Sequence, residues 1–130
     1  MICIDSDCII DFLKGEKKAV GIITSYKEEI ATTEINVFEV YFGIYLRESV
    51  SQKEEDTADL FLSSIEMLSS NNGWGKQSAK LIADLAKQGR IIDKNDCFIS
   101  SIMKANNCNK IITRNVKHFC RIKGIEIIPY

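Results

Sequence analysis

Short apolar runs and longer segments of helical periodicity alternate along this chain. A short apolar run predicts a buried strand, and apolar residues three or four positions apart predict an amphipathic helix. We therefore expect strands over residues 1–5, 30–33, 110–113 and 126–128. We expect helices over residues 6–14, 17–29, 35–47, 53–64, 76–87, from 93 or 95 to 105, and over 116–121, with a loop over 69–75. Strands that alternate with helices indicate an α/β domain whose mostly parallel sheet is covered on both faces.

The helix over 35–47 has a strong amphipathic pattern, because large apolar residues follow i, i+3 and i+7 spacing. These residues are Ile35, Phe38, Phe42 and Tyr45. The helix over 53–64 is expected to carry its own apolar side, formed by Leu60 and Phe61 together with Ile65. We expect most of these side chains to fill the core. The alternative is that they offer an apolar contact surface to a partner protein.

Composition indicates one soluble domain over residues 1–130, because no linker or repeat divides the chain. The 45% hydrophobic content suffices for a core, yet no apolar run approaches the roughly 20 residues of a membrane helix. No segment resembles a signal peptide. Five cysteines, an odd number without CxxC spacing, favour reduced thiols over a disulfide framework. We therefore expect a cytoplasmic protein with no membrane segment.

The net charge of −1 lacks the basic footprint that is typical of nucleic-acid binding. It does not exclude such a role, because acidic metal ligands lower the net charge while a bound ion adds local positive potential. With His118 as the single histidine and no paired cysteines, a zinc site is poorly supplied.

Two carboxylates stand at positions where an acid is unexpected. Asp5 directly follows the first strand, at the edge of an open α/β sheet where ligands bind. Alternatively it starts a loop or caps the first helix, a role for which Ser6 and Asp7 compete. Glu39 lies on or beside the apolar side of its helix, where an unpaired carboxylate is costly to bury. Glu39 is therefore a candidate functional group, unless it is bonded to an arginine or a backbone group.

Asp93 and Asp96 open the helix that ends at residue 105, and acids at a helix start are common caps. One of them is expected to cap, whereas Asp96 shares a helix face with Ile99 and Met103 and is expected to point inward. The segment 113–115 (Thr-Arg-Asn) ends another strand, where it supplies neutral oxygens and hydrogen-bond donors or caps a loop. Oxygen ligands without His or Cys suit a hard cation, and Mg²⁺ or Mn²⁺ fits best.

Four segments of the chain resemble, in order and spacing, the signature blocks of PIN-domain nucleases, and most closely those of VapC-type toxins of toxin–antitoxin pairs. They read IDSDCIIDFL, TTEINVFEVYFG, GRIIDKNDCFISSIMKA and KIITRNVKHFCRIKGIEII. The resemblance implies a three-layer α/β domain with a five-stranded parallel sheet of order 3-2-1-4-5. It also implies a further strand within 65–68 and Mg²⁺-dependent cleavage of RNA by a metal-activated water.

The resemblance assigns the family's three acids to Asp5, Glu39 and Asp96, as catalytic residues and metal ligands. The fourth position, often aspartate in the family, is Asn115 here, and Asp93 is an auxiliary metal ligand. Because the fourth position is neutral, we expect one firmly held metal ion rather than two.

Basic residues flank the expected site and are candidates for contacts with substrate phosphates. They are Arg90, Lys94, Arg114 and Lys117, with Thr113 as a further substrate-binding candidate; an ordinary solvated surface is the alternative for each. His118 is not expected to be catalytic. The resemblance further implies an RNA substrate, a homodimer and a small antitoxin protein whose tail covers the acidic groove.

Two other functions remain open. The Asp5-Ser6-Asp7 triplet also resembles the start of DxD-type phosphatases, but the later lysine and GDxxxD-like acidic pair of those enzymes have no counterpart here. Alternatively, Asn115 in place of an acid would suit a PIN-like interaction or regulatory module with weakened catalysis.

Overall fold

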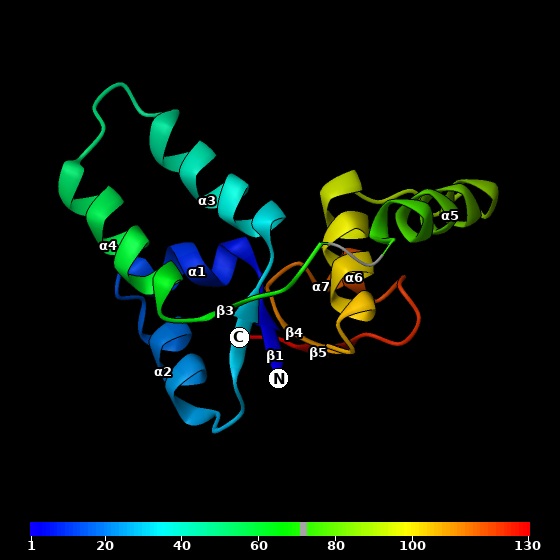
Figure 1. Cartoon of the computed structure of the whole chain (residues 1–130), viewed down its shortest axis with the longest axis horizontal. Coiled ribbons are helices and arrows are strands. Elements are labelled where there is room, and N and C mark those ends of the chain that lie inside the picture. The colour runs from blue at the N-terminus through cyan, green and yellow to red at the C-terminus, as the bar shows by residue number, and fades with distance from the viewer. Residues whose placement is uncertain (71–72) are drawn as a thin grey trace.

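Five parallel strands form one sheet in the computed structural model, which describes residues 1–70 and 73–130. They are β1 (Ile2–Ile4), β2 (Ile30–Thr32), β3 (Glu66–Met67), β4 (Lys110–Ile112) and β5 (Glu126–Ile128). Their order across the sheet is β3-β2-β1-β4-β5, so the predicted fold class and strand order are confirmed (Figure 1). The strand implied within 65–68 is β3.

Helices cover both faces of this sheet. Their bounds are α1 (Ser6–Leu13), α2 (Lys17–Ser25), α3 (Glu34–Tyr45), α4 (Gln52–Ser63), α5 (Trp74–Lys87), α6 (Lys94–Ala105) and α7 (Val116–Phe119). Buried residues of α1 to α4 form one core cluster, and those of α5, α6 and α7 form the other. No helix in the described ranges is long and apolar enough to cross a membrane.

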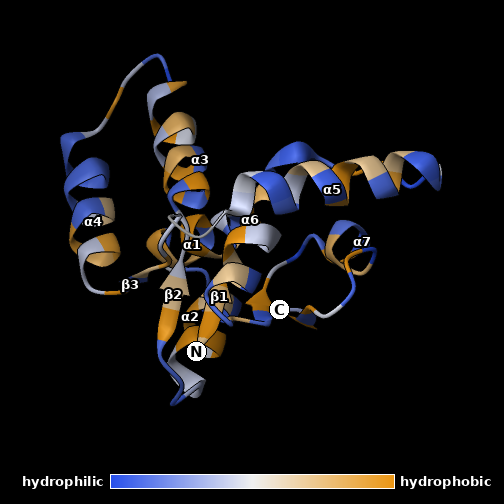
Figure 2. Cartoon of the chain, turned by 45° about the vertical axis from the view of Figure 1, so that its right-hand side comes forward, coloured by the Kyte–Doolittle hydropathy of each residue, from blue (hydrophilic) through white to orange (hydrophobic). Residues whose placement is uncertain are grey.

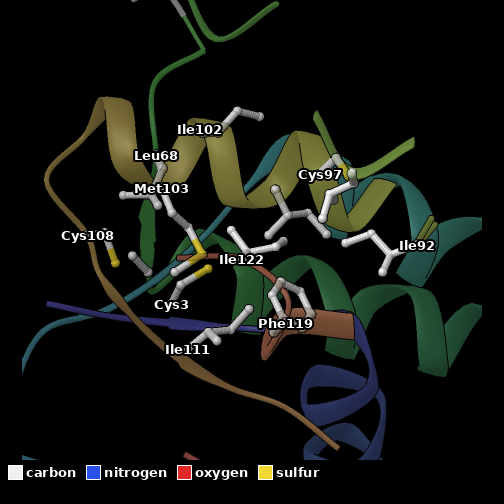
Figure 3. Packing of buried hydrophobic residues seen from close by; sticks show 13 residues of the cluster. Cys3, Leu68, Ile92, Cys97, Ile102, Met103, Cys108, Ile111, Phe119 and Ile122 are labelled. Carbon is white, nitrogen blue, oxygen red and sulfur yellow. The ribbon is translucent and has the colours of Figure 1, made fainter. Parts of the chain in front are cut away.

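The strands supply both cores because successive side chains point to opposite faces of a sheet. Ile2 and Ile4 of β1 belong to the cluster under α1 to α4. Cys3, between them, belongs to the cluster under α5 to α7, where it lies with Ile111 and Met103 (Figure 3). All five cysteines are free thiols, and only Cys120 is exposed, which agrees with the predicted reduced state.

The ends of the two central strands meet at one edge of the sheet. Ile4 of β1 is in register with Ile112 of β4, and the next backbone amide, that of Asp5, donates to the carbonyl oxygen of Ile112 at 3.0 Å. Thr113 therefore emerges beside Asp5, although 108 positions separate them in the chain. This register positions the candidate site.

Several element boundaries differ from the prediction. The helix expected over 17–29 ends at Ser25, because Tyr26 has extended backbone angles and leads the chain toward β2. The helix α5 begins at Trp74 rather than at residue 76, after Gly73 in a left-handed conformation (φ 70°). Of the loop expected over 69–75, residues 71 and 72 lie outside the described residues. The short helix expected over 116–121 ends at Phe119.

The predicted apolar side of α3 is wrong at three of its four residues, because only Ile35 is partly buried against the core. Phe38, Phe42 and Tyr45 are 57%, 52% and 52% exposed, whereas Val40 and Ile44 are buried. Apolar residues occur all around this helix, as the orange segments along α3 indicate (Figure 2), so spacing alone does not single out the buried side.

The expected core position of Leu60 on α4 is also wrong, because this side chain is 74% exposed. Ala58 and Leu62 are buried in its place, and Phe61 and Ile65 are partly buried against the same cluster. The buried side of α4 therefore carries Ala58 and Leu62, and this helix contacts α1 and α3.

Candidate metal and catalytic site

A cavity of about 320 Å³ opens at the edge of the sheet where β1 and β4 end. Its walls come from the beginnings of α1 and α6, from one turn of α3, and from α7 with the residue before it. The lining residues are Asp5, Ser6, Asp7, Glu39, Asp93, Asn95, Asp96, Asn115 and His118. The fold thus brings Asp5, Glu39, Asp96 and Asn115, the four predicted catalytic residues, to one cavity.

Asp5 is the most buried of these acids, at 4% exposure. Its Oδ1 accepts hydrogen bonds from the backbone amide of Ser6 and from Asn36 Nδ2, both at 2.9 Å. Its Oδ2 accepts a hydrogen bond from Thr113 Oγ1 at 2.7 Å. Asp5, not Ser6, caps α1, so the capping role and the functional role considered for Asp5 coincide in one side chain.

Burial raises the pKa of the Asp5 carboxyl from 3.8 to about 7. The hydrogen bond from Thr113 acts against this increase, whereas the nearby charges of Asp7 and Asp96 add to it. A negative charge on Asp5 is therefore costly in the protein alone, and a cation in the cavity would relieve that cost.

Glu39 is held by two neutral side chains. Its Oε2 accepts a hydrogen bond from Ser6 Oγ at 2.6 Å, and its Oε1 accepts one from Asn95 Nδ2 at 2.8 Å. Among the described residues, no arginine and no backbone group bonds to the Glu39 carboxylate. The alternative that Glu39 is paired with an arginine or a backbone group is therefore wrong.

Asp93 and Asp96 divide their roles as predicted. Asp93 is exposed and caps α6, its Oδ1 accepting a hydrogen bond from the backbone amide of Asn95 at 2.8 Å. Asp96 is buried on the same side of α6 as Ile99 and Met103. Its Oδ2 accepts a hydrogen bond from Asn115 Nδ2 at 2.9 Å and lies 2.5 Å from His118 Nδ1.

The electrostatics of Asp96 resemble those of Asp5. Burial raises the pKa of Asp96, the contact with His118 lowers it, and the charges of Asp93 and Glu39 raise it again. In the described part of the chain, no lysine or arginine forms an ion pair with Asp5, Glu39 or Asp96. Within the described residues, Asp5, Glu39 and Asp96 are therefore held by amide, hydroxyl and imidazole groups, whereas Asp7 at the same cavity pairs with Arg114.

The donor chemistry fits a hard divalent cation, because carboxylate and amide oxygens line the cavity. Across residues 1–70 and 73–130, however, no three His, Cys, Asp or Glu side chains form a ready-made metal cluster. Both carboxylate oxygens of Asp5 and of Glu39 accept hydrogen bonds from neighbouring donors.

The predicted substrate-binding residues do not line the cavity. Arg114 pairs with Asp11 at 3.2 Å and with Asp7 at 3.8 Å, and its guanidinium lies over the ring of Tyr130. Arg90 and Lys94 are exposed and do not line the cavity.

Thr113 is fully buried, and its hydroxyl donates to Asp5. It positions the carboxylate rather than facing a substrate. Its oxygen also accepts a hydrogen bond from the backbone amide of Asn115 at 2.9 Å, so Thr113 links two of the predicted catalytic residues.

Three side chains that contact the acids, those of Asn36, Asn95 and His118, were not predicted from the sequence to do so. Asn36 is recognisable in retrospect, because Thr33 and Asn36 form a reciprocal capping box at the start of α3, and Asn36 also reaches Asp5. Asn95 donates to Glu39 and carries no comparable signal. His118 lies three positions after Asn115, which puts both on one side of the short helix α7 beside Asp96.

Comparison with known proteins identifies the family. A family model described as PIN domain matches residues 2–125. The chain belongs to the PIN-domain family. Ribonuclease VapC2 of Rickettsia felis is 31% identical to this PIN domain over 99 residues, which are 74% of this chain and 70% of that protein. The resemblance to VapC-type members is thereby confirmed.

Several solved structures share this fold over all or nearly all of the chain. The VapBC2 complex of Rickettsia felis, bound to a DNA fragment from its promoter, contains a chain with a TM-score of 0.85 and 23% identity, covering 100% of this PIN domain and 99% of that chain. VapBC-1 from nontypeable Haemophilus influenzae contains a chain with a TM-score of 0.83 and 25% identity, and the match covers 99% of this PIN domain and 98% of that chain. The DNA-bound VapBC of Salmonella typhimurium contains a chain with a TM-score of 0.83 and 19% identity, and the match covers 98% of this PIN domain and 96% of that chain.

Proposed function

We propose that this PIN domain is a metal-dependent endoribonuclease and the toxin of a toxin–antitoxin pair. The observation that carries the proposal is the convergence of Asp5, Glu39 and Asp96 in one cavity without a lysine or arginine partner among the described residues. Buried acids of like charge are costly unless a cation joins them. Membership of a family that includes a ribonuclease 31% identical to this chain gives the reaction class.

Asp5, Asp96 and Glu39 would hold the cation, with Asp93 as an auxiliary ligand at the mouth of the cavity. Mg²⁺ is the expected ion and Mn²⁺ an alternative. When bound, such an ion supplies positive charge for phosphoryl oxygens and lowers the pKa of a coordinated water.

The protein's own residues prepare this site. Asn36 and Thr113 fix the Asp5 carboxylate from both sides, so its oxygens do not need to reorganise during the reaction. Glu39, less buried than Asp5, is the group that accepts a proton from the attacking water. Asn115 directs its amide nitrogen at Asp96, which supports one metal ion rather than two.

The RNA strand would approach the cavity past exposed basic residues near the start of α6. Arg90 precedes this helix and Lys94 is its first residue, and both side chains are exposed and available to phosphates. Arg114 is held by two aspartates, so it contributes only after leaving Asp7 and Asp11.

An antitoxin partner and a homodimer belong to the same proposal. The similar structures include a toxin–antitoxin complex from Klebsiella pneumoniae. A second cavity of about 360 Å³ lies between α1, α3 and α4, with apolar walls from Ile10, Leu13, Val40 and Ile44 and the cation of Arg47 at its edge. An apolar segment of an antitoxin fits this groove, and an arginine from the same tail would neutralise the acids at the catalytic cavity.

The exposed aromatic side of α3 is the surface that we assign to the homodimer. Phe38 and Phe42 stack with their ring centroids 5.5 Å apart, and Tyr45 continues the patch by one turn. Adjacent exposed aromatic rings are typical of surfaces that another protein covers.

The decisive experiment is cleavage of a mixed RNA pool by purified protein with Mg²⁺, with Mn²⁺ and with chelator. Asp5→Asn is the matched control, because it keeps the shape of the side chain and removes one anionic ligand. We expect cleavage by the native protein with either ion and a loss of at least about 100-fold in the control or in chelator, the size expected when a metal ligand or a preorganised charge is removed.

Equal cleavage by the native and control proteins would contradict the nuclease proposal. The neutral Asn115 supports a second candidate, an interaction module of PIN fold with weakened catalysis. That candidate predicts no cleavage by the native protein together with intact binding of the antitoxin.

A further inference from the structure

His118, which was not expected to be catalytic, lies at the candidate cavity in contact with Asp96. It belongs to α7, lines the cavity, and places Nδ1 2.5 Å from Asp96 Oδ2. Its side chain is 36% exposed, whereas that of Asp96 is 10% exposed, so the imidazole covers the outer side of the carboxylate. No other imidazole exists in the chain, and no lysine or arginine in the described residues takes this place.

Two side chains of one helical turn converge on the same oxygen of Asp96. Asn115 Nδ2 lies 2.9 Å and His118 Nδ1 2.5 Å from Oδ2, and the two nitrogens are 3.0 Å apart. Within the described residues no hydrogen bond reaches Oδ1 of Asp96. The carboxylate is thereby oriented, with one oxygen engaged by the protein and the other left for a ligand.

The support for His118 is itself rigid. The next residue, Phe119, is fully buried in the core cluster under α5 and α6. The backbone amide of His118 donates to the carbonyl oxygen of Asn115 at 3.2 Å, which closes the turn that carries both side chains. The backbone that carries the imidazole is therefore anchored to the core beside Asp96.

We propose that His118 is a positioning residue, whose Nδ1 holds Oδ2 of Asp96 so that Oδ1 is presented to the divalent cation. This inference rests on the proposed function, because it takes the ligand of the cavity to be a cation. It does not make His118 a catalytic residue: the imidazole acts through Asp96. Partners that orient a ligating carboxylate commonly change metal affinity by about 10- to 100-fold when they are removed.

The test is calorimetric titration of Mn²⁺ into the full-length protein and three variants. His118→Asn keeps a nitrogen at the position of Nδ1, whereas His118→Gln places its nitrogen near the position of Nε2, and His118→Ala keeps neither. We expect the dissociation constant for Mn²⁺ to rise about tenfold or more in the Ala and Gln variants and to stay within about threefold of native in the Asn variant. Asp96→Asn is the control in which binding is lost.

Thermal unfolding of each variant in chelator shows whether the fold is retained, and affinities are compared among folded variants only. Native affinity in both the Ala and the Gln variants would overturn the inference while leaving the proposed function intact. So would an Asn variant as weak as the Ala variant, because the effect would then not come through Nδ1. A native protein that does not bind Mn²⁺ would overturn the proposed function and this inference together.

Discussion

At the scale of single residues, the site is a set of acids held by neutral donors. Asp5 has three such donors, Glu39 has two and Asp96 has an amide and an imidazole. Hydrogen bonds satisfy the oxygens but do not cancel the charges, so burial still raises the pKa of both Asp5 and Asp96. The free protein is therefore strained electrostatically at the place where a cation is expected.

The elevated pKa of Asp5 makes folding stability depend on pH. Because the carboxyl titrates near 3.8 when unfolded and near 7 when folded, its favourable contribution is complete below about pH 4 and is lost as the pH rises through 7. The difference corresponds to roughly 4 kcal/mol at most, at about 1.4 kcal/mol per pKa unit. Asp5→Asn removes this loss, and its amide can still meet Thr113 Oγ1. We expect the variant to be more stable than the native protein at pH 8 in chelator.

Urea unfolding at pH 5, 6, 7 and 8 measures this difference. Asp84→Asn on the exposed side of α5 is the matched control and should leave the pH profile unchanged. If the native protein and Asp5→Asn show parallel profiles across this range, the Asp5 carboxylate is not destabilised by burial.

At the scale of elements, α3 connects the site to the rest of the molecule. Its first turn supplies Asn36 to Asp5, and its second turn supplies Glu39 to the cavity. Hydrogen bonds from Tyr41 to Asp59 and from Tyr45 to Glu55 join it to α4. Its buried side is narrow and aliphatic, and its aromatic side faces solvent.

Because the aliphatic side of α3 is buried and its aromatic side is exposed, truncating one residue on each side should change the free energy of unfolding by different amounts. Ile44→Ala removes a buried side chain and should lower the free energy of unfolding by about 2–4 kcal/mol. Phe42→Ala removes a larger side chain that is 52% exposed and should change it by about 0.5 kcal/mol. Urea denaturation of both variants under identical conditions provides the measurement; a larger effect for Phe42 would mean that its ring is covered in the isolated protein.

At the scale of the whole molecule, two layers of helices leave the candidate cavity open at one edge of the sheet and leave the aromatic side of α3 exposed. The cavity and the exposed aromatic patch share α3, with Glu39 adjacent to Phe38 in the sequence. Association through this patch would place a second copy of the chain next to the mouth of the cavity.

Charge on the patch should therefore separate the proposed dimer. We expect Phe38→Glu combined with Phe42→Glu to convert a dimer into a monomer, because two carboxylates per protomer would be buried at the contact. Light scattering coupled to size-exclusion chromatography gives the mass. Leu60→Glu on α4 is the control, since Leu60 is also exposed but lies on another helix. A dimer that survives the double substitution must use a different surface.

The residue pattern by itself predicted four of the five strands, the helices and a mostly parallel sheet, whereas β3 was expected only from the resemblance to PIN-domain nucleases. The pattern also singled out three acids as candidates, because Asp5 immediately follows an apolar strand, Glu39 lies beside apolar residues of its helix, and Asp96 shares a helix face with Ile99 and Met103. Such signals are local, and local spacing reports which residues share a face of one element.

Only the tertiary structure decided which face of α3 is buried and which partners hold each acid. Apolar residues surround α3, so its orientation depends on where α1 and α4 lie rather than on its own pattern. The contact between His118 and Asp96 joins positions 22 apart, and that between Asn95 and Glu39 joins positions 56 apart. Such contacts depend on strand register and helix packing, which spacing along the chain does not encode.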